Sequence, residues 1–190
     1  MLMNTANRLR LLKLIEKGTA LRADQRGASA LEFAIFAGIL AFGVLNTADI
    51  SMYIYKRMQL ENATEMAVQA AWKTCDPSKG YLPATTSCPS LTTAITNAAQ
   101  STTLGSSVSI QTGSPTEGYY CLNTSGALQF VAAVTSTPPA DCTSTGVPSM
   151  QPADYIQITA AYAYAPLFPG VTVAGVFTTP IVKTGMMRLN

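Results

Sequence analysis

A single acidic residue stands within an apolar stretch near the start of the 190-residue chain. In residues 28–45, ASALEFAIFAGILAFGVL, the only charged side chain is that of Glu32. A carboxylate inside an apolar membrane helix costs free energy, so it is a candidate functional group by default. Glu32 is the fifth residue after Gly27, and the aromatic Phe33 follows it.

A cut after Gly27 would give Glu32 a cationic partner. Ala28 would then carry a free α-amine, which is largely charged at neutral pH. The amine of one subunit and the Glu32 carboxylate of its neighbour could pair when two helices pack side by side. Such a pair offsets the burial of both charges and sets the axial register of the subunits.

The cysteines form the second group of residues with readable chemistry. The chain has four, all after the apolar stretch: Cys75, Cys88, Cys121 and Cys142. An even number on the side expected to be exported predicts two disulfides in an oxidising compartment. Of the three possible pairings we favour the sequence-local one, 75–88 with 121–142. The spacings lack the close Cys-x-x-Cys pairs of zinc sites, so we expect no metal.

Other catalytic chemistry has little support. The chain has no histidine, which removes the commonest general base and the commonest metal ligand. It has no Gly-rich nucleotide-binding motif, and the acidic residues of 75–190 are few and scattered, unlike the paired carboxylates of glycosidases. A net charge of +2 does not point to nucleic acid. We therefore expect neither an enzyme nor a bound cofactor.

Basic residues in front of the apolar stretch indicate its orientation. Residues 1–27 hold six Lys or Arg against two Asp or Glu, a balance of +4, while residues 28–190 sum to −2. As a helix, residues 28–45 would span about 27 Å, close to the hydrocarbon thickness of a bilayer. The positive-inside rule then predicts a cytoplasmic N-terminus and an exported C-terminal part.

Two other interpretations of this stretch remain. A cleavable secretory signal would have an unusually long basic region, Glu32 in its apolar core, and only a weak cleavage site at Ala41-Phe42-Gly43. A plain signal anchor accounts for the apolar length but leaves the spacing of Gly27 and Glu32 unexplained.

The helix is expected to continue beyond the apolar stretch to about residue 74. Residues 46–72 contain no Pro or Gly, and Pro77 and Gly80 mark the end. Asp49, just past the apolar stretch, is expected in a solvated or interfacial position. A stripe at helical spacing is formed by Leu60, Ala63, Ala67, Ala70 and Ala71. An outer interfacial belt is expected from Tyr53, Tyr55, Lys56 and Arg57.

Residues 75–190 predict a small head of one short helix and several strands. After a loop at 75–89, Ser90 is a plausible N-cap of a helix that reaches about Gln100. The clearest period-2 strand is 155–164. Pro180 weakens the first half of a final strand or strand pair at 176–189. Further β-compatible segments lie at 107–111, 119–122 and 127–134, and residues 136–152 are a loop by composition.

Two ends of the chain carry a family resemblance. Gly27 followed by Glu32-Phe33 resembles the prepilin processing motif of type IV pilin-like proteins, and RGASALEFAIFAGIL is similar in particular to TadE-like pseudopilins of tight-adherence (Flp) pilus systems. Near the other end, AYAYAPLFP at 161–169 and TGMMR at 184–188 resemble segments of the same family. The middle, about 75–150, matches nothing we recognise.

The resemblance implies an α+β, pilin-like fold: a long N-terminal transmembrane and scaffold helix, a short second helix and a small antiparallel sheet packed on it. It divides the chain into a basic leader (1–27), the helix (28–74) and a periplasmic or extracellular head (75–190). It implies processing at Gly27, with Ala28 as the new N-terminus, Glu32 as the processing and register glutamate, and Phe33 as the aromatic of the motif. The leader is long for the family, and Ala28 replaces the usual Phe or Met.

The same resemblance implies the partners and the location. A minor pilin would be cut by a prepilin peptidase and would wait in the bacterial inner membrane as a single-pass protein among membrane lipids. It would then join other pilin subunits at the inner-membrane assembly platform and take part in pilus assembly or initiation. The alternative function is an unprocessed, membrane-anchored envelope protein whose head binds a partner or ligand. A secreted domain with a hydrolytic role is a third, weaker hypothesis.

Overall fold

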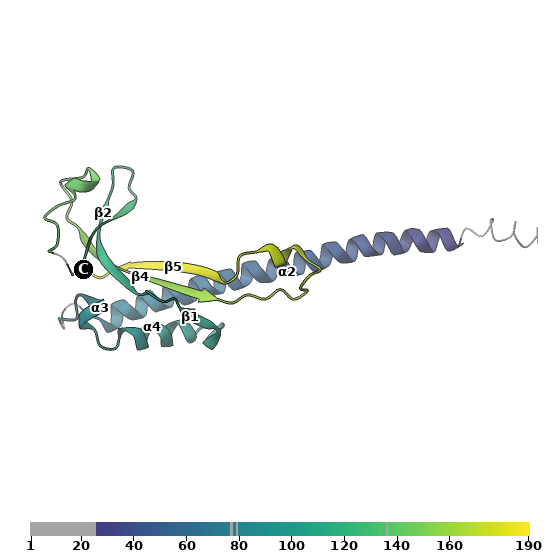
Figure 1. Ribbon diagram of the computed structural model, residues 1–190, viewed down its shortest axis with the longest axis horizontal. Coiled ribbons are helices and arrows are strands. Elements are labelled where there is room, and N and C mark those ends of the chain that lie inside the picture. The colour runs from purple at the N-terminus through teal and green to yellow at the C-terminus, as the bar shows by residue number, and fades with distance from the viewer. Residues whose placement is uncertain (1–25, 77, 79, 136) are drawn as a thin grey trace, which may run out of the picture. The chain divides into compact units, whose positions relative to one another are not determined.

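The computed structural model describes residues 26–190 except 77, 79 and 136, so most of the expected leader lies outside the described residues. The fold class is α+β, as expected (Figure 1). The helices are α2 (Arg26–Thr74), α3 (Ala84–Ser87) and α4 (Leu91–Gln100), with 3-10 turns η2 (Gly105–Ser107), η3 (Thr143–Thr145) and η4 (Val173–Val176). The strands are β1 (Val108–Ile110), β2 (Thr116–Leu122), β3 (Leu128–Ala133), β4 (Ala153–Tyr162) and β5 (Ile181–Arg188).

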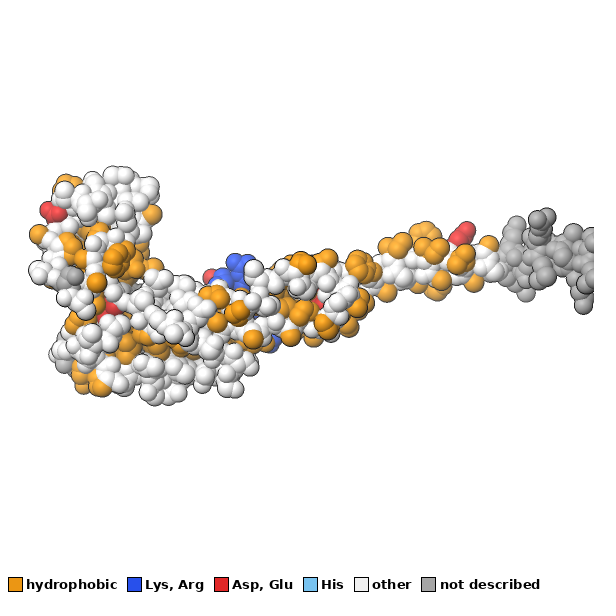
Figure 2. Space-filling model, in the orientation of Figure 1, with side chains coloured by type: hydrophobic (Ala, Val, Ile, Leu, Met, Phe, Trp, Pro, Cys, Tyr) orange, Lys and Arg blue, Asp and Glu red, His pale blue; other side chains and the backbone are white. Residues whose placement is uncertain are grey.

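The chain separates into two compact units, one ending at Ala48 and one running from Asp49 to Asn190. In the first unit the described residues are helical, and their apolar side chains are exposed (Figure 2). The second unit contains the sheet, the short helices and the last 26 residues of α2. The sequence-based division at residue 75 follows the end of the helix, whereas packing places the start of the head at Asp49.

In the second unit, the face of α2 with small residues enters the core. Leu60, Ala63, Ala67 and Ala71 are fully buried, at the three- and four-residue spacing expected from the sequence. They share one hydrophobic cluster with Ile95 of α4 and with residues of β4. Short side chains let neighbouring elements approach the helix closely, so the stripe of alanines is a packing surface.

Strand β4 is the centre of an antiparallel sheet. It pairs with β5 along Tyr155–Tyr162, with β2 through residues 153–157, and with β1 through residues 160–162; β3 pairs with β2. Alternate residues Ile156, Ile158 and Ala160 are buried, which confirms the expected period-2 face. The last strand begins at Ile181, directly after Pro180, because proline lacks the N–H that a sheet ladder needs.

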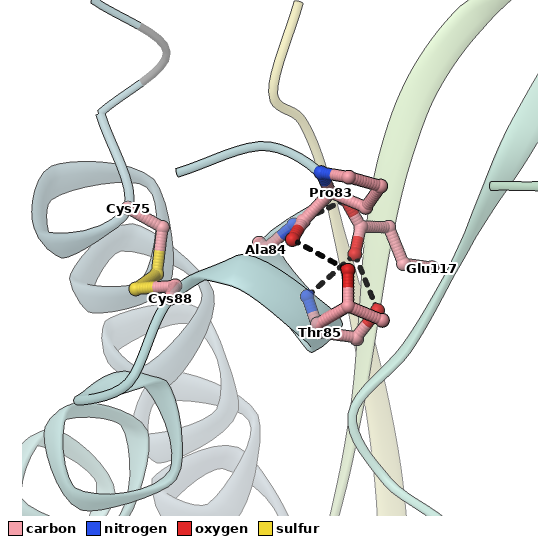
Figure 3. Close-up of a disulfide and its surroundings, with 7 residues drawn as sticks. Cys75, Pro83, Ala84, Thr85, Cys88 and Glu117 are labelled. Carbon is pink, nitrogen blue, oxygen red and sulfur yellow. Dashed lines mark hydrogen bonds between the residues drawn. A yellow bond between two sulfur atoms is a disulfide. The ribbon is translucent and has the colours of Figure 1, made fainter. Parts of the chain in front are cut away.

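Two disulfides close the head. Cys75, just after α2, bonds to Cys88, which follows α3, and Cys121 of β2 bonds to Cys142 (Figure 3). This is the sequence-local pairing. The first bridge closes a loop of about 14 residues and contributes roughly 3 kcal/mol by restricting the unfolded chain. Ser90 does occupy the N-cap position of α4, but its side chain makes no capping hydrogen bond, and the short helix α3 was not expected.

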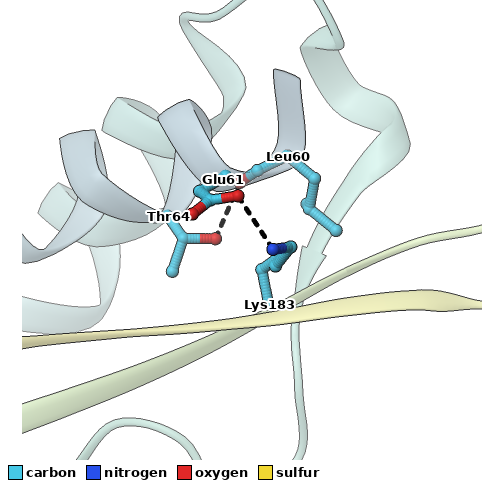
Figure 4. A network of polar contacts seen from close by, with 4 residues as sticks. All are labelled: Leu60, Glu61, Thr64 and Lys183. Atoms are coloured by element: carbon cyan, nitrogen blue, oxygen red, sulfur yellow. Dashed lines mark hydrogen bonds and ion pairs between the residues drawn. The ribbon is translucent and has the colours of Figure 1, made fainter. Parts of the chain in front are cut away.

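A glycine allows β5 to lie against α2. A Cβ at Gly185 would stand 3.1 Å from Cγ2 of Thr64 and 3.5 Å from its carbonyl oxygen. The Thr64 hydroxyl donates to the Leu60 carbonyl oxygen at 2.8 Å, and Lys183 of β5 pairs with Glu61 of α2 at 2.8 Å (Figure 4). Surface ion pairs contribute little, so close backbone packing at Gly185 defines this contact.

Candidate functional site

The predicted processing residues lie in the first turns of α2. Gly27, Ala28, Glu32 and Phe33 are all helical and exposed. Among the described residues, none donates a hydrogen bond to the Glu32 carboxylate or forms an ion pair with it. A carboxylate surrounded by apolar side chains and lacking an internal partner needs a partner from outside this part of the chain once water is removed.

The apolar segment around Glu32 is uncovered by the rest of the protein. Phe33 is 75% exposed, and the large side chains of Leu31, Phe36, Ile39, Leu40 and Val44 are exposed as well. Within residues 27–74, the helix contains a window long and apolar enough to cross a membrane, and none of that window is buried. Single-pass anchoring is what this length and composition indicate.

Gly27 has no structural role within the chain. A Cβ built at this position meets no atom within 4 Å, and the residue lies in a regular helix. Glycine in a helix is less stable than alanine by about 1 kcal/mol. The residue is therefore not explained by folding, and the same holds for Gly38 farther along the helix.

Asp49 corrects one of the expectations drawn from the sequence. It was expected in a solvated or interfacial position, but its side chain is completely buried in the second unit. Its carboxylate accepts hydrogen bonds from the backbone N–H of Leu167 (2.7 Å) and of Phe168 (3.3 Å), and from the hydroxyl of Thr172. These donors satisfy the carboxylate, which makes its burial possible.

The donors to Asp49 all come from one loop, residues 163–180, which joins β4 to β5. Tyr164 strengthens the same attachment, since its hydroxyl donates to the backbone carbonyl oxygen of Asp49 at 3.1 Å. Burial, together with the nearby Asp49 charge, raises the pKa of Tyr164 and keeps its hydroxyl protonated as a donor. The ring of Tyr53 packs on Tyr164 and Phe177, with centroid distances of 5.2 and 4.6 Å. Tyr53 therefore serves the core and not an exposed interfacial belt.

We expect Asp49→Ala to loosen this loop without unfolding the head. Its removal leaves the N–H groups of Leu167 and Phe168 without their acceptor. Amide hydrogen exchange of the segment containing these residues should accelerate by about tenfold or more.

The matched control is Asp141→Ala, which removes an exposed carboxylate that accepts from the N–H of Thr143 in another part of the head. Exchange at Leu167 and Phe168 should then be unchanged. Equal protection of these amides in the wild type and in Asp49→Ala would show that the carboxylate does not hold the loop.

Two carboxyl groups of the head lie together, although the sequence suggested only scattered acidic residues. Glu117 accepts from the backbone N–H of Ala84 (2.8 Å) and from the N–H and hydroxyl of Thr85 (both 2.7 Å), as Figure 3 shows. Asp154 hydrogen-bonds to Glu117 and is buried, and its Oδ1 has no hydrogen-bond partner among the described residues. Burial, followed by the Glu117 charge, raises the pKa of Asp154 to about 7.

This pair is explained by structure. Glu117 is engaged by the start of α3, so it connects that short helix to β2. A protonated Asp154 beside it avoids the repulsion of two charges. Within the described residues no group of three or more His, Cys, Asp or Glu could hold a metal.

The raised pKa of Asp154 predicts that the head loses stability as the pH rises from about 5 to 7. The folded protein holds a proton that the unfolded chain, with its ordinary carboxyl pKa, has already released, so raising the pH favours unfolding. Above this window both states are ionised and the contribution levels off.

Denaturant unfolding at several pH values between 5 and 8 checks this prediction. Asp154→Asn should remove the downward slope, whereas Asp141→Asn should keep it, because hydrogen bonds from Thr143 lower the pKa of Asp141 and move its titration below this range. Identical slopes for the wild type and Asp154→Asn would contradict the assignment.

Comparison with known proteins bears on the helix. Neither the curated proteins nor the solved structures contain a match to the chain. The resemblances noted at 161–169 and 184–188 lie outside the residues that a family model matches, and they stay predictions. Residues 27–69, which begin at the candidate processing glycine and include Glu32, match the model of the TadE-like protein family. Over this segment the resemblance seen in the sequence is confirmed: the chain is similar to TadE-like proteins, a family of pilus-related proteins with a membrane-anchoring helix.

Proposed function

We propose that this chain is a minor pilin or pseudopilin of a tight-adherence type IV pilus. A prepilin peptidase cuts after Gly27, the processed subunit is held in the inner membrane by α2, and it then joins other pilin subunits at the assembly platform. The head lies on the periplasmic side, where its two disulfides form. The single observation that carries the proposal is an exposed apolar helix with one unpaired carboxylate, Glu32, five residues after Gly27.

The exposed helix supports assembly as the role of this segment. Large apolar side chains from Leu31 to Val44 are exposed, so lipid must cover them before assembly and neighbouring subunits can replace lipid afterwards. Both environments are dry, and in both Glu32 needs a counter-charge. The amine released at Ala28 supplies one on an adjacent copy, which also sets how far one subunit is displaced along its neighbour.

Gly27 supports processing, because its local surroundings do not require glycine. A Cβ there meets nothing within 4 Å, so a requirement from outside the chain explains it better than folding does. The family match that starts at residue 27 agrees with a cut at this position. If the chain were left uncut, the basic residues of 1–27 would remain attached, and the protein would act as a permanent envelope anchor for its head.

Processing is tested by expressing the chain with and without the prepilin peptidase of its own system and measuring its intact mass. We expect the loss of residues 1–27 only when the peptidase is present. Gly27→Val should block the cut, because a branched side chain replaces the hydrogen before the scissile bond.

Gly38→Val is the matched control, since Gly38 is also an exposed helical glycine with nothing within 4 Å of its Cβ position. It should be processed as the wild type is. A chain that keeps Met1 in the presence of the peptidase, with pili assembled as usual, would favour the unprocessed anchor.

The register role is tested separately with Glu32→Gln, which keeps the shape of the side chain and removes its charge. This variant should insert into the membrane normally, since losing a charge makes insertion easier. Subunit incorporation, measured as the amount of this protein in sheared pili or in cross-linked assembly complexes, should fall by about tenfold or more, as expected for the loss of roughly 1.4 kcal/mol or more of pairing energy. Normal incorporation of Glu32→Gln would rule out the proposed ion pair.

A further inference from the structure

The loop at 163–180 presents apolar side chains to its surroundings and carries no charge. Val176 is 83% exposed, Leu167 is 55% exposed, and Val171 and Val173 are each about half exposed. From Tyr155 to Val182 the sequence contains no Asp, Glu, Lys or Arg. Exposed branched aliphatic residues in an uncharged segment indicate a surface that is covered by another apolar phase.

Asp49 holds this loop at one level of α2. The N–H groups of Leu167 and Phe168 and the hydroxyl of Thr172 all donate to its carboxylate. Asp49 is four positions beyond Leu45, the end of the apolar stretch, and the helix is continuous there. Four residues of helix rise about 6 Å, which is comparable to the thickness of one interfacial layer of a bilayer.

We propose that the loop 163–180 is a second membrane contact, in addition to the anchoring helix. Its exposed residues Leu167, Val171, Val173 and Val176 enter the boundary between headgroups and acyl chains of the leaflet nearest to Asp49. The aromatic side chain of Tyr55, 53% exposed one and a half turns farther along α2, suits the same interfacial region. The inference needs only the anchoring of α2, so it is independent of processing and of pilus assembly.

The chemistry of the loop favours a neutral phospholipid surface over another protein as its occupant. The attachment to Asp49 is continuous with the membrane anchor, and it fixes the loop where a bilayer surface must pass if residues 28–45 span it. Since the loop has no Lys or Arg, its contact should not depend on anionic lipid. A second copy of the chain is the competing occupant, and the experiment separates the two.

The test uses the full chain in nanodiscs of zwitterionic phosphatidylcholine, with or without bromine on the acyl chains as a fluorescence quencher. Trp72 is the only tryptophan of the protein, so Trp72→Phe combined with Val176→Trp reports on the loop alone. Brominated lipid should reduce this emission at least twofold. A second reporter, Val171→Trp in the same background, covers the case that the first variant folds poorly.

Two controls report on head surfaces away from the loop. The native Trp72, 53% exposed and 23 residues beyond Asp49 on α2, should keep its emission in brominated lipid, as should a tryptophan introduced by Leu128→Trp in β3. Adding anionic lipid should leave the quenching of the loop reporters unchanged.

Three results would overturn the proposal. The first is equal emission of both loop reporters in brominated and unbrominated discs that contain one anchored copy. The second is emission that changes only when two copies share a disc, which would assign the surface to a second subunit. The third is quenching that requires anionic lipid, which would contradict a contact made by an uncharged loop.

Discussion

A buried carboxylate on a long helix determines where the rest of the head is attached. Asp49 accepts two backbone N–H groups and a hydroxyl from the loop at 163–180, and this loop connects the central strand β4 with β5. The position of Asp49 thus restricts where both strands can lie on α2. Gly185 completes the restriction farther along, because the absence of a side chain lets β5 approach Thr64. The sheet is consequently fixed to the helix at two separated levels, by a polar contact near Asp49 and by close backbone packing near Thr64.

One helix serves two environments because its side chains change in size along its length. Residues before Ala48 carry large apolar side chains that remain exposed in the single chain, which suits lipid or neighbouring helices. Residues from Leu60 to Ala71 place alanines on the buried face, which suits a sheet at short distance. Glu32 and Asp49 mark the contrast: both are acidic residues of the same helix, but only Asp49 finds its partners within the described part of the chain.

The elements could be predicted from the sequence wherever periodicity was strong, and the contacts between them could not. The buried face of β4, the alanine stripe of α2 and the start of β5 after Pro180 follow from side-chain spacing and from the missing N–H of proline. Asp49 was misassigned because its donors lie more than 110 residues away in sequence, and Glu117 and Asp154 looked scattered for the same reason. The glycine inside the final strand and the uncharged run from Tyr155 to Val182 were signals that could have revealed the close approach and the apolar loop. The processing and register residues remain predictions, since they concern an event between molecules.

The two disulfides also bear on the order in which the head can mature. Each bridge joins cysteines that are near in sequence, 13 and 21 residues apart, and neither bridge encloses the other. If the chain emerges from the membrane in sequence order, the first covalent loop can close before Cys121 has been delivered, and the second before β4 exists. The sheet must wait longer, since its central strand and β5 are synthesised last. Thiol oxidation can therefore proceed ahead of strand assembly, with little opportunity for a cysteine of one loop to be captured by the other.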